Sequence, residues 1–164
     1  MSMEKDLEAK IKELEARVKV LEDIEAIKKM KAKTDFTVDK RDWDGFLKLF
    51  ARECSGEYPG GIKCPTRQDV EKFFREVVDQ TATWMLHYHH NPYIDVEGDT
   101  ARAIWYWTAP TVGIDGKARW TAGKGDDVYV REDGGWKHRE NNLTVFYMCD
   151  YDDPEGWANK CEQP

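Results

Sequence analysis

Apolar residues near the start of the chain recur at alternating spacings of four and three, with Glu and Lys between them. The repeating positions are Leu7, Ile11, Leu14, Val18 and Leu21. This heptad spacing predicts one long helix over residues 4–32, and it makes residues 1–23 a candidate contact between subunits. The pattern shifts at Ile24 and Ile27, as expected where a helix leaves one partner and packs onto another. The alternative is a single amphipathic helix docked on its own domain.

Two further helical segments are indicated before the pattern changes. Residues 34–50 carry apolar side chains at helical spacing, and the polar run 39–42 interrupts them as a bend or a helix start. Residues 51–65 are predicted as a loop with a short strand. Thr66 followed by Asp69 is typical of a capping box, which predicts that the next helix begins there.

From residue 83 onward the chain alternates with a period of two, which indicates strands. The predicted strands are residues 83–90, 93–96, 100–108, 119–131 and 136–147. Gly98-Asp99 and Asp133-Gly134-Gly135 have the composition of tight hairpin turns. Helices followed by antiparallel strands predict an α+β fold in which a strongly curved sheet wraps around the helices and leaves a pocket at its mouth. The domain is expected over residues 24–150, with a C-terminal tail over 151–164; the chain from 148 onward is expected to wrap the surface.

Composition narrows the classes of partner. The chain has 164 residues and a net charge of −7, without a basic stripe, so nucleic acid and anionic membranes are not expected to bind. No apolar run approaches the roughly 20 residues that span a bilayer, and the polar start predicts a cytoplasmic protein. The four cysteines form no CxxC pair and are expected to be free thiols. Without a metal motif or a Gly-rich phosphate loop, we expect neither a metal nor another cofactor.

Histidine is concentrated in one short segment. Three of the four His residues lie at positions 87, 89 and 90, and alternation along a strand puts His87 and His89 on the same face. Because imidazole titrates near neutral pH, His87 is a candidate general acid or base. The alternatives are a metal site, for which no third ligand is visible, and polar decoration of a strand.

Asp39 and two tryptophans are the other candidates for chemistry. Asp39 is a lone carboxylate in an apolar stretch, either a solvated helix cap or the group that orients an imidazole. Trp105 and Trp107 share one face of their predicted strand. They are either core residues or the lining of a pocket for a flat, apolar substrate.

Several short motifs resemble SnoaL-like proteins of the nuclear-transport-factor-like superfamily. The resemblance covers roughly residues 20–150. It rests on the segments 23–27, 37–44, 87–92, 98–101 and 133–137. The chain looks most similar to the branch containing scytalone dehydratase, bile acid 7α-dehydratase and hexachlorocyclohexane dehydrochlorinase. This implies a cone-shaped domain in which an Asp orients a His that abstracts a proton, and Asp39 and His87 fall on those positions. It also implies a homo-oligomer, a trimer first and a dimer next.

The chain departs from that branch at positions that hold the substrate. A tyrosine five residues before the aspartate is replaced by Thr34, and further polar positions fall near Ala109 and Val145. His89, Asn141, Asn142 and Tyr106 are possible replacements. The predicted substrate contacts are Thr34, Trp43, His89, Trp105, Trp107, Asn142 and Val145.

The resulting expectation is a cofactor-independent lyase. It would remove a proton from a bulky apolar, aromatic or steroid-like small molecule and expel water, halide or a fragment such as formaldehyde. A ketosteroid-type isomerase or polyketide cyclase would use the same base. The alternative of another class is a non-catalytic domain that binds a small ligand or acts as a scaffold.

Overall fold

One long helix begins the chain. The computed structural model describes residues 3–153, and helix α1 runs without interruption over Met3–Asp39. The predicted break near residue 33 is therefore wrong. The first interruption is at residues 40–42, where Arg41 has a φ of 56°, and the short helix α2 follows over Trp43–Leu47. The Asp42 carboxylate caps α2 by accepting the Gly45 N–H at 2.9 Å.

The segment 51–65, predicted as a loop with a short strand, is mostly strand. Strand β1 covers Phe50–Tyr58, and a turn joins it to β2, Ile62–Cys64. β1 pairs in parallel with β7, and an irregularity between Phe50 and Ser55 breaks its alternation. That irregularity explains why the sequence pattern concealed the strand, since a bulge shifts side chains from one face to the other.

The predicted capping box is confirmed. The Thr66 side chain accepts the Asp69 N–H, and the Asp69 carboxylate accepts the Thr66 N–H at 3.1 Å. Helix α3 spans Arg67–Lys72 and continues through a π turn, Phe73–Val77, and a 3₁₀ turn, Val78–Gln80.

The remaining strands form the body of one sheet. They are β3 (Ala82–Met85), β4 (Tyr88–Glu97), β5 (Thr100–Gly113), β6 (Ala118–Glu132) and β7 (Gly135–Asp150). The sheet order is β2-β1-β7-β6-β5-β3, and β4 also pairs with β5. Both predicted hairpin turns are confirmed between β4 and β5 and between β6 and β7. The predicted strand 83–90 is divided at residues 86–87, and residues 148–150 belong to β7 rather than to a tail. The predicted tail lies outside the described residues from 154 onward.

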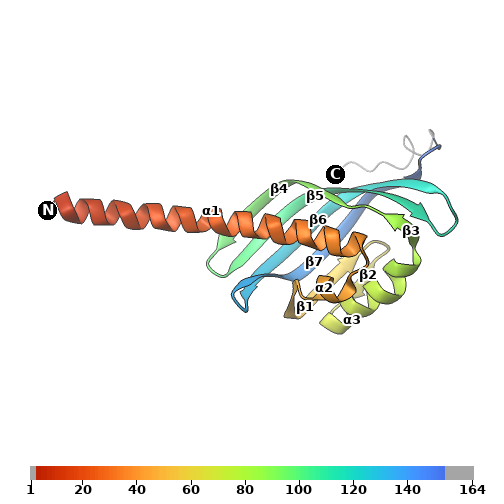
Figure 1. Cartoon of the computed structure of the whole chain (residues 1–164), viewed down its shortest axis with the longest axis horizontal. Helices are drawn as coiled ribbons and strands as arrows, with labels where there is room; N and C mark the ends of the chain where they lie inside the picture. The colour runs from red at the N-terminus through yellow and green to blue at the C-terminus, as the bar shows by residue number, and fades with distance from the viewer. Residues whose placement is uncertain (1–2, 154–164) are drawn as a thin grey trace.

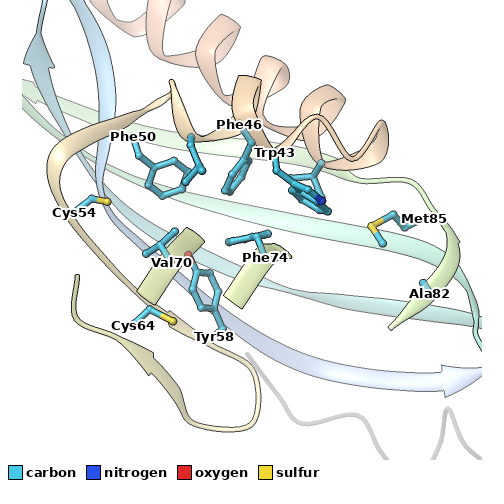
Figure 2. Packing of buried hydrophobic residues seen from close by; sticks show 12 residues of the cluster. Trp43, Phe46, Phe50, Cys54, Tyr58, Cys64, Val70, Phe74, Ala82 and Met85 are labelled. Carbon is cyan, nitrogen blue, oxygen red and sulfur yellow. The ribbon is translucent and has the colours of Figure 1, made fainter. Parts of the chain in front are cut away.

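The sheet is curved and unclosed, and the helices cover its inner face (Figure 1). The predicted α+β class is confirmed. One apolar cluster lies between α2, α3 and β1, where Phe46 contacts Phe50 and Phe74 with ring centroids 4.8 and 4.3 Å apart (Figure 2). A second cluster includes Ile27 of α1, Trp105 of β5 and Tyr129 of β6. The second cluster fixes the C-terminal half of α1 against the sheet.

No helix among residues 3–153 combines the length and the apolarity needed to cross a membrane.

Candidate active site

Asp39 and His87 meet although 48 residues separate them. Asp39 ends α1, and His87 lies in the link between β3 and β4. Its Nδ1 is 2.8 Å from Asp39 Oδ1, and its backbone N–H donates to the same oxygen at 3.0 Å. A carboxylate only accepts hydrogen bonds, so the neutral tautomer that fits this contact carries its proton on Nδ1 and its lone pair on Nε2. The side chains of His87 and Asp39 are 23% and 11% exposed, so this imidazole remains in reach of solvent.

A second Asp–His pair lies deeper than the first. Asp35 precedes Asp39 by one turn of α1, and His89 follows His87 by two residues. Asp35 Oδ1 is 2.7 Å from His89 Nδ1, and the two side chains are only 10% and 8% exposed. The ring orientation does not suit a hydrogen bond, so neither ring nitrogen of His89 has a hydrogen-bond partner among the described residues. Burial lowers the pKa of His89 to about 2 and raises the pKa of Asp35 to about 6. Both groups thus favour their neutral forms more than exposed counterparts would.

A buried ion pair lies on the same inner face. Lys31 Nζ is 2.7 Å from Asp127 Oδ2, with side chains 2% and 0% exposed. Asp127 also accepts hydrogen bonds from the Tyr129 hydroxyl at 2.7 Å and the Asn141 amide at 2.8 Å. The Trp105 indole N–H donates in turn to the Tyr129 hydroxyl at 3.0 Å. Burial alone raises the pKa of Asp127, but Lys31 and the other partners outweigh burial and hold this pKa at about 2.

Thr34 makes a separate set of buried hydrogen bonds. Its hydroxyl donates to the Met30 carbonyl at 3.0 Å, and its oxygen lies 3.1 Å from His138 Nε2. The His138 ring stacks on Phe50 with centroids 4.8 Å apart. Burial lowers the pKa of His138 to about 3, so this ring is neutral at physiological pH. Thr34, predicted as a substrate contact, is therefore already engaged with protein partners.

The two tryptophans play different structural roles. Trp105 is buried in the apolar cluster with Tyr129, which agrees with the core alternative for this residue. Trp107 is also buried, but its indole N–H has no hydrogen-bond partner in the described part of the chain. Its ring lies against Gly123, where a side-chain Cβ would come within 2.8 Å of it. Val145 is the β7 residue opposite Gly123, so the structure brings Val145 to the Trp107 region.

Two predicted substrate contacts are placed differently. Trp43 packs against Phe74 in the apolar cluster, and its indole N–H donates to Asp79 at 3.3 Å. Asn142 does not reach the dyad, because alternation along β7 turns Asn141 inward and Asn142 to the opposite face. There the Asn142 side chain accepts the Glu57 N–H at 3.0 Å.

Sequence reasoning missed much of the polar interior. Lys31 and Asp35 precede Asp39 at steps of four, which places all three on one face of α1. This spacing was the available signal. Asp127 lies 96 positions from Lys31, and nothing local in the sequence connects them.

In the described part of the chain, neither an ion-binding cluster nor the hollow beside β1 marks the dyad. Within residues 3–153 no group of three or more His, Cys, Asp or Glu side chains is arranged to hold a metal ion. A hollow of about 560 Å³ opens beside β1 instead, and its lining includes Arg52, Arg67 and Glu140. Arg67 is already committed to backbone carbonyls, including those of Phe50 and Ala51 at 3.0 Å. The chemistry of the Asp39–His87 pair therefore defines the candidate site.

A match to a known protein family shows which family this chain belongs to. The sequence pattern of the SnoaL-like domain matches residues 19–142, a span that contains Asp39 and His87. The chain belongs to the SnoaL-like family. This confirms the resemblance seen in the short motifs.

Solved structures similar to this SnoaL-like chain agree on the fold. A scytalone dehydratase candidate from Novosphingobium aromaticivorans is 22% identical, with a TM-score of 0.74, and the match covers 80% of this chain and 89% of that one. A type 3 hexachlorocyclohexane dehydrochlorinase from Novosphingobium barchaimii is 18% identical, with a TM-score of 0.76 and coverages of 83% and 94%. A nuclear-transport-factor-2-like protein from Salmonella enterica is 21% identical, with a TM-score of 0.67 and coverages of 73% and 87%. These similarities establish the cone fold of the superfamily.

Proposed function

We propose that this protein is a cofactor-independent lyase that uses His87 as its general base on a bulky apolar, aromatic or steroid-like molecule. The observation that carries the proposal is the 2.8 Å contact between His87 Nδ1 and Asp39. In the neutral ring this contact places the proton on Nδ1, leaves the lone pair on Nε2, and fixes the direction of the ring. The dehydratase and dehydrochlorinase names among the structural neighbours agree with elimination chemistry.

The proposed reaction is an elimination next to a carbonyl group. His87 Nε2 takes a proton from the carbon beside the carbonyl, and the electron pair of that C–H bond forms the carbon–carbon double bond. The bond to the leaving group on the adjacent carbon breaks, and the leaving group departs with its electron pair as water, after protonation, or as halide. Asp39 stabilises the imidazolium that results. Loss of formaldehyde from a hydroxymethyl group on the carbon beside the carbonyl would begin at the same base, which takes the hydroxyl proton. The C–O bond then becomes C=O, the bond between the two carbons breaks, and its electron pair moves into the carbonyl as an enolate that the imidazolium protonates at carbon.

The buried second pair supports a place for the substrate's polar end. The ring nitrogens of His89 lack hydrogen-bond partners among residues 3–153, as does the Trp107 indole N–H. Buried polar groups without partners are costly, so a substrate oxygen that accepts from the Trp107 indole N–H, or from the His89 ring nitrogen that carries the proton, is favoured there. His89, Trp107 and Val145 are therefore the substrate contacts that we propose, whereas the Asn142 side chain bonds the Glu57 N–H.

The test measures proton abstraction separately from loss of a leaving group. Aryl ketones are incubated with the protein in D₂O, and exchange of the hydrogen beside the carbonyl is followed by NMR. A matched panel of β-hydroxy aryl ketones reports elimination through the absorbance of the conjugated product. Wild type is expected to catalyse exchange across the panel, and elimination where the hydroxyl is present.

His87→Gln and Asp39→Asn are each expected to lower the exchange rate by about two orders of magnitude or more. The two losses should be less than additive, because the residues act as a unit. His90→Gln is the matched control, since His90 is an exposed histidine on β4, three residues after His87. Binding of the ketones without exchange would favour the ligand-binding alternative, and exchange that survives in His87→Gln would reject this base.

A further inference from the structure

The N-terminal half of α1 carries an exposed apolar stripe. Every residue from 3 to 22 is exposed, and this part of the helix projects away from the cone (Figure 1). The stripe consists of Leu7, Ile11, Leu14, Val18 and Leu21, each 47–65% exposed. An isolated helix of this length is only marginally stable in water, so the stripe needs an apolar partner.

The stripe ends where the domain begins. Asp23 is the first buried residue of α1, and Ile27 is completely buried in the cone. The next two positions of the heptad repeat are Glu25 and Lys28, both exposed and charged. The apolar repeat over residues 7–22 therefore serves a contact outside its own domain.

We propose that residues 7–22 form a parallel, two-stranded coiled coil with a second copy of this chain. In heptad notation, the a positions are Ile11 and Val18, and the d positions are Leu7, Leu14 and Leu21. β-Branched residues at a combined with Leu at d favour two strands over three or four in parallel coils. This inference is independent of the proposed catalytic function.

The charges beside the stripe select the parallel orientation. The e positions are Glu8, Glu15 and Glu22, and the g positions include Lys10 and Arg17. In a parallel pair, each g residue faces the e residue of the following heptad on the other chain. Lys10 then faces Glu15 of the partner subunit, and Arg17 faces Glu22 of the partner subunit. An antiparallel pair would instead bring e to e and g to g, which repel.

Lys10 and Arg17 can leave their partners within one chain for the glutamates of a second chain. Within one chain Lys10 and Arg17 both approach Glu13, at 2.7 and 3.9 Å, while their side chains remain 58% and 70% exposed. Such exposed pairs contribute little, so turning toward a partner costs little. A parallel coil would hold both cones at the same end of a two-fold axis.

The decisive experiment compares two identical substitutions on the same helix. Val18 lies on the stripe, whereas Val20 is an exposed valine on another face of α1. Val18→Glu is expected to convert a dimer to a monomer in sedimentation velocity, because it places a carboxylate in the contact between the two stripes. Val20→Glu should keep the dimer mass. A trimeric or monomeric wild type, or a Val18→Glu variant that stays dimeric, would overturn the proposal.

Orientation is tested by cross-linking. Three of the four cysteines are buried, and the fourth, Cys161, lies outside the described residues and is replaced by Ser in this experiment. In that background Leu21→Cys should form an intersubunit disulfide under mild oxidation, because a parallel coil juxtaposes the two d residues. Val20→Cys in the same background is the control and should remain uncross-linked. Circular dichroism of every variant reports whether the cone is folded. A dimer in which the cysteines at position 21 do not cross-link, while the cone stays folded, would overturn the parallel arrangement.

Discussion

The two halves of α1 invert the usual distribution of side chains in opposite ways. The projecting half exposes apolar residues such as Leu14 and Val18, whereas the half under the sheet buries Lys31, Thr34 and Asp35. Neither arrangement stabilises a monomeric domain by itself. Exposed apolar area is favourable only when something covers it, and buried polar groups are tolerated only when they are paired or bind a ligand.

The difference teaches that one continuous helix can serve two functions through side chains alone. The backbone of α1 is helical from Met3 to Asp39, so nothing in its local conformation separates the halves. The boundary is the contact with Arg131, whose guanidinium binds Asp23 at 2.6 Å. Beyond this point the helix leaves the sheet. If the two halves are independent, substitutions in the buried half should change stability without changing the dimer mass, and substitutions in the stripe should do the reverse.

The largest expected effect is on stability and belongs to the buried half. Lys31→Met removes the positive charge that faces Asp127 and leaves a fully buried carboxylate without a counter-charge, which should cost about 3–5 kcal/mol of the free energy of unfolding. Lys29→Met is the matched control, because the Lys29 side chain is 76% exposed and pairs only loosely with Glu25. Urea denaturation of both variants measures the difference. Equal losses in the two variants would mean that the buried pair contributes nothing special.

The next effect is a dependence of stability on pH. His138 has a folded pKa of about 3 against an ordinary value of 6.5, so between these values the unfolded chain binds more protons. Stability should therefore fall as the pH drops from 6.5 toward 3, by about 1.4 kcal/mol per pH unit for each such group. His89 acts in the same direction, with a pKa of about 2. Asp35 opposes both between its ordinary 3.8 and about 6, because its folded form keeps a proton longer.

The same denaturation experiment, repeated across this pH range, tests the assignment. His138→Gln removes one titrating group and should flatten the slope of stability against pH, whatever its effect on stability at pH 7. A variant with the wild-type slope would show that His138 does not titrate as described. Substitutions in the stripe, such as Val18→Glu, should leave the slope of stability against pH unchanged if the two halves of α1 are independent.

The smallest expected effect is at the boundary itself. Arg131 binds Asp23 and Asp99, and its guanidinium lies 4.6 Å from the Trp136 ring centroid. Arg131→Gln should reduce the free energy of unfolding by about 1 kcal/mol, since these contacts are partly solvated. The dimer mass should not change. Loss of the dimer in this variant would show that the dimer contact of the projecting half depends on the Arg131–Asp23 contact.

Local features were the most predictable from the sequence. The Thr66–Asp69 capping box and both hairpin turns involve residues a few positions apart, so their residue types determine them directly. The length of strand β1 was missed in a segment predicted as a loop with a short strand, because a bulge and a parallel partner far along the chain replace the alternation that identifies strands. The separation of Asp39 and His87 allowed no deduction from spacing, and their pairing was expected only from family resemblance.

By itself, the sequence determined the heptad stripe and its charges, the capping and turn positions, and the clustering of three His residues. These depend on spacings within one element, which backbone geometry converts directly into faces. Only the tertiary structure decided which of those faces are covered. It joined Lys31 to Asp127 and Thr34 to His138, and it turned Asn141 inward and Asn142 outward. Such contacts depend on strand register and sheet curvature, which are set by the packing of the whole chain.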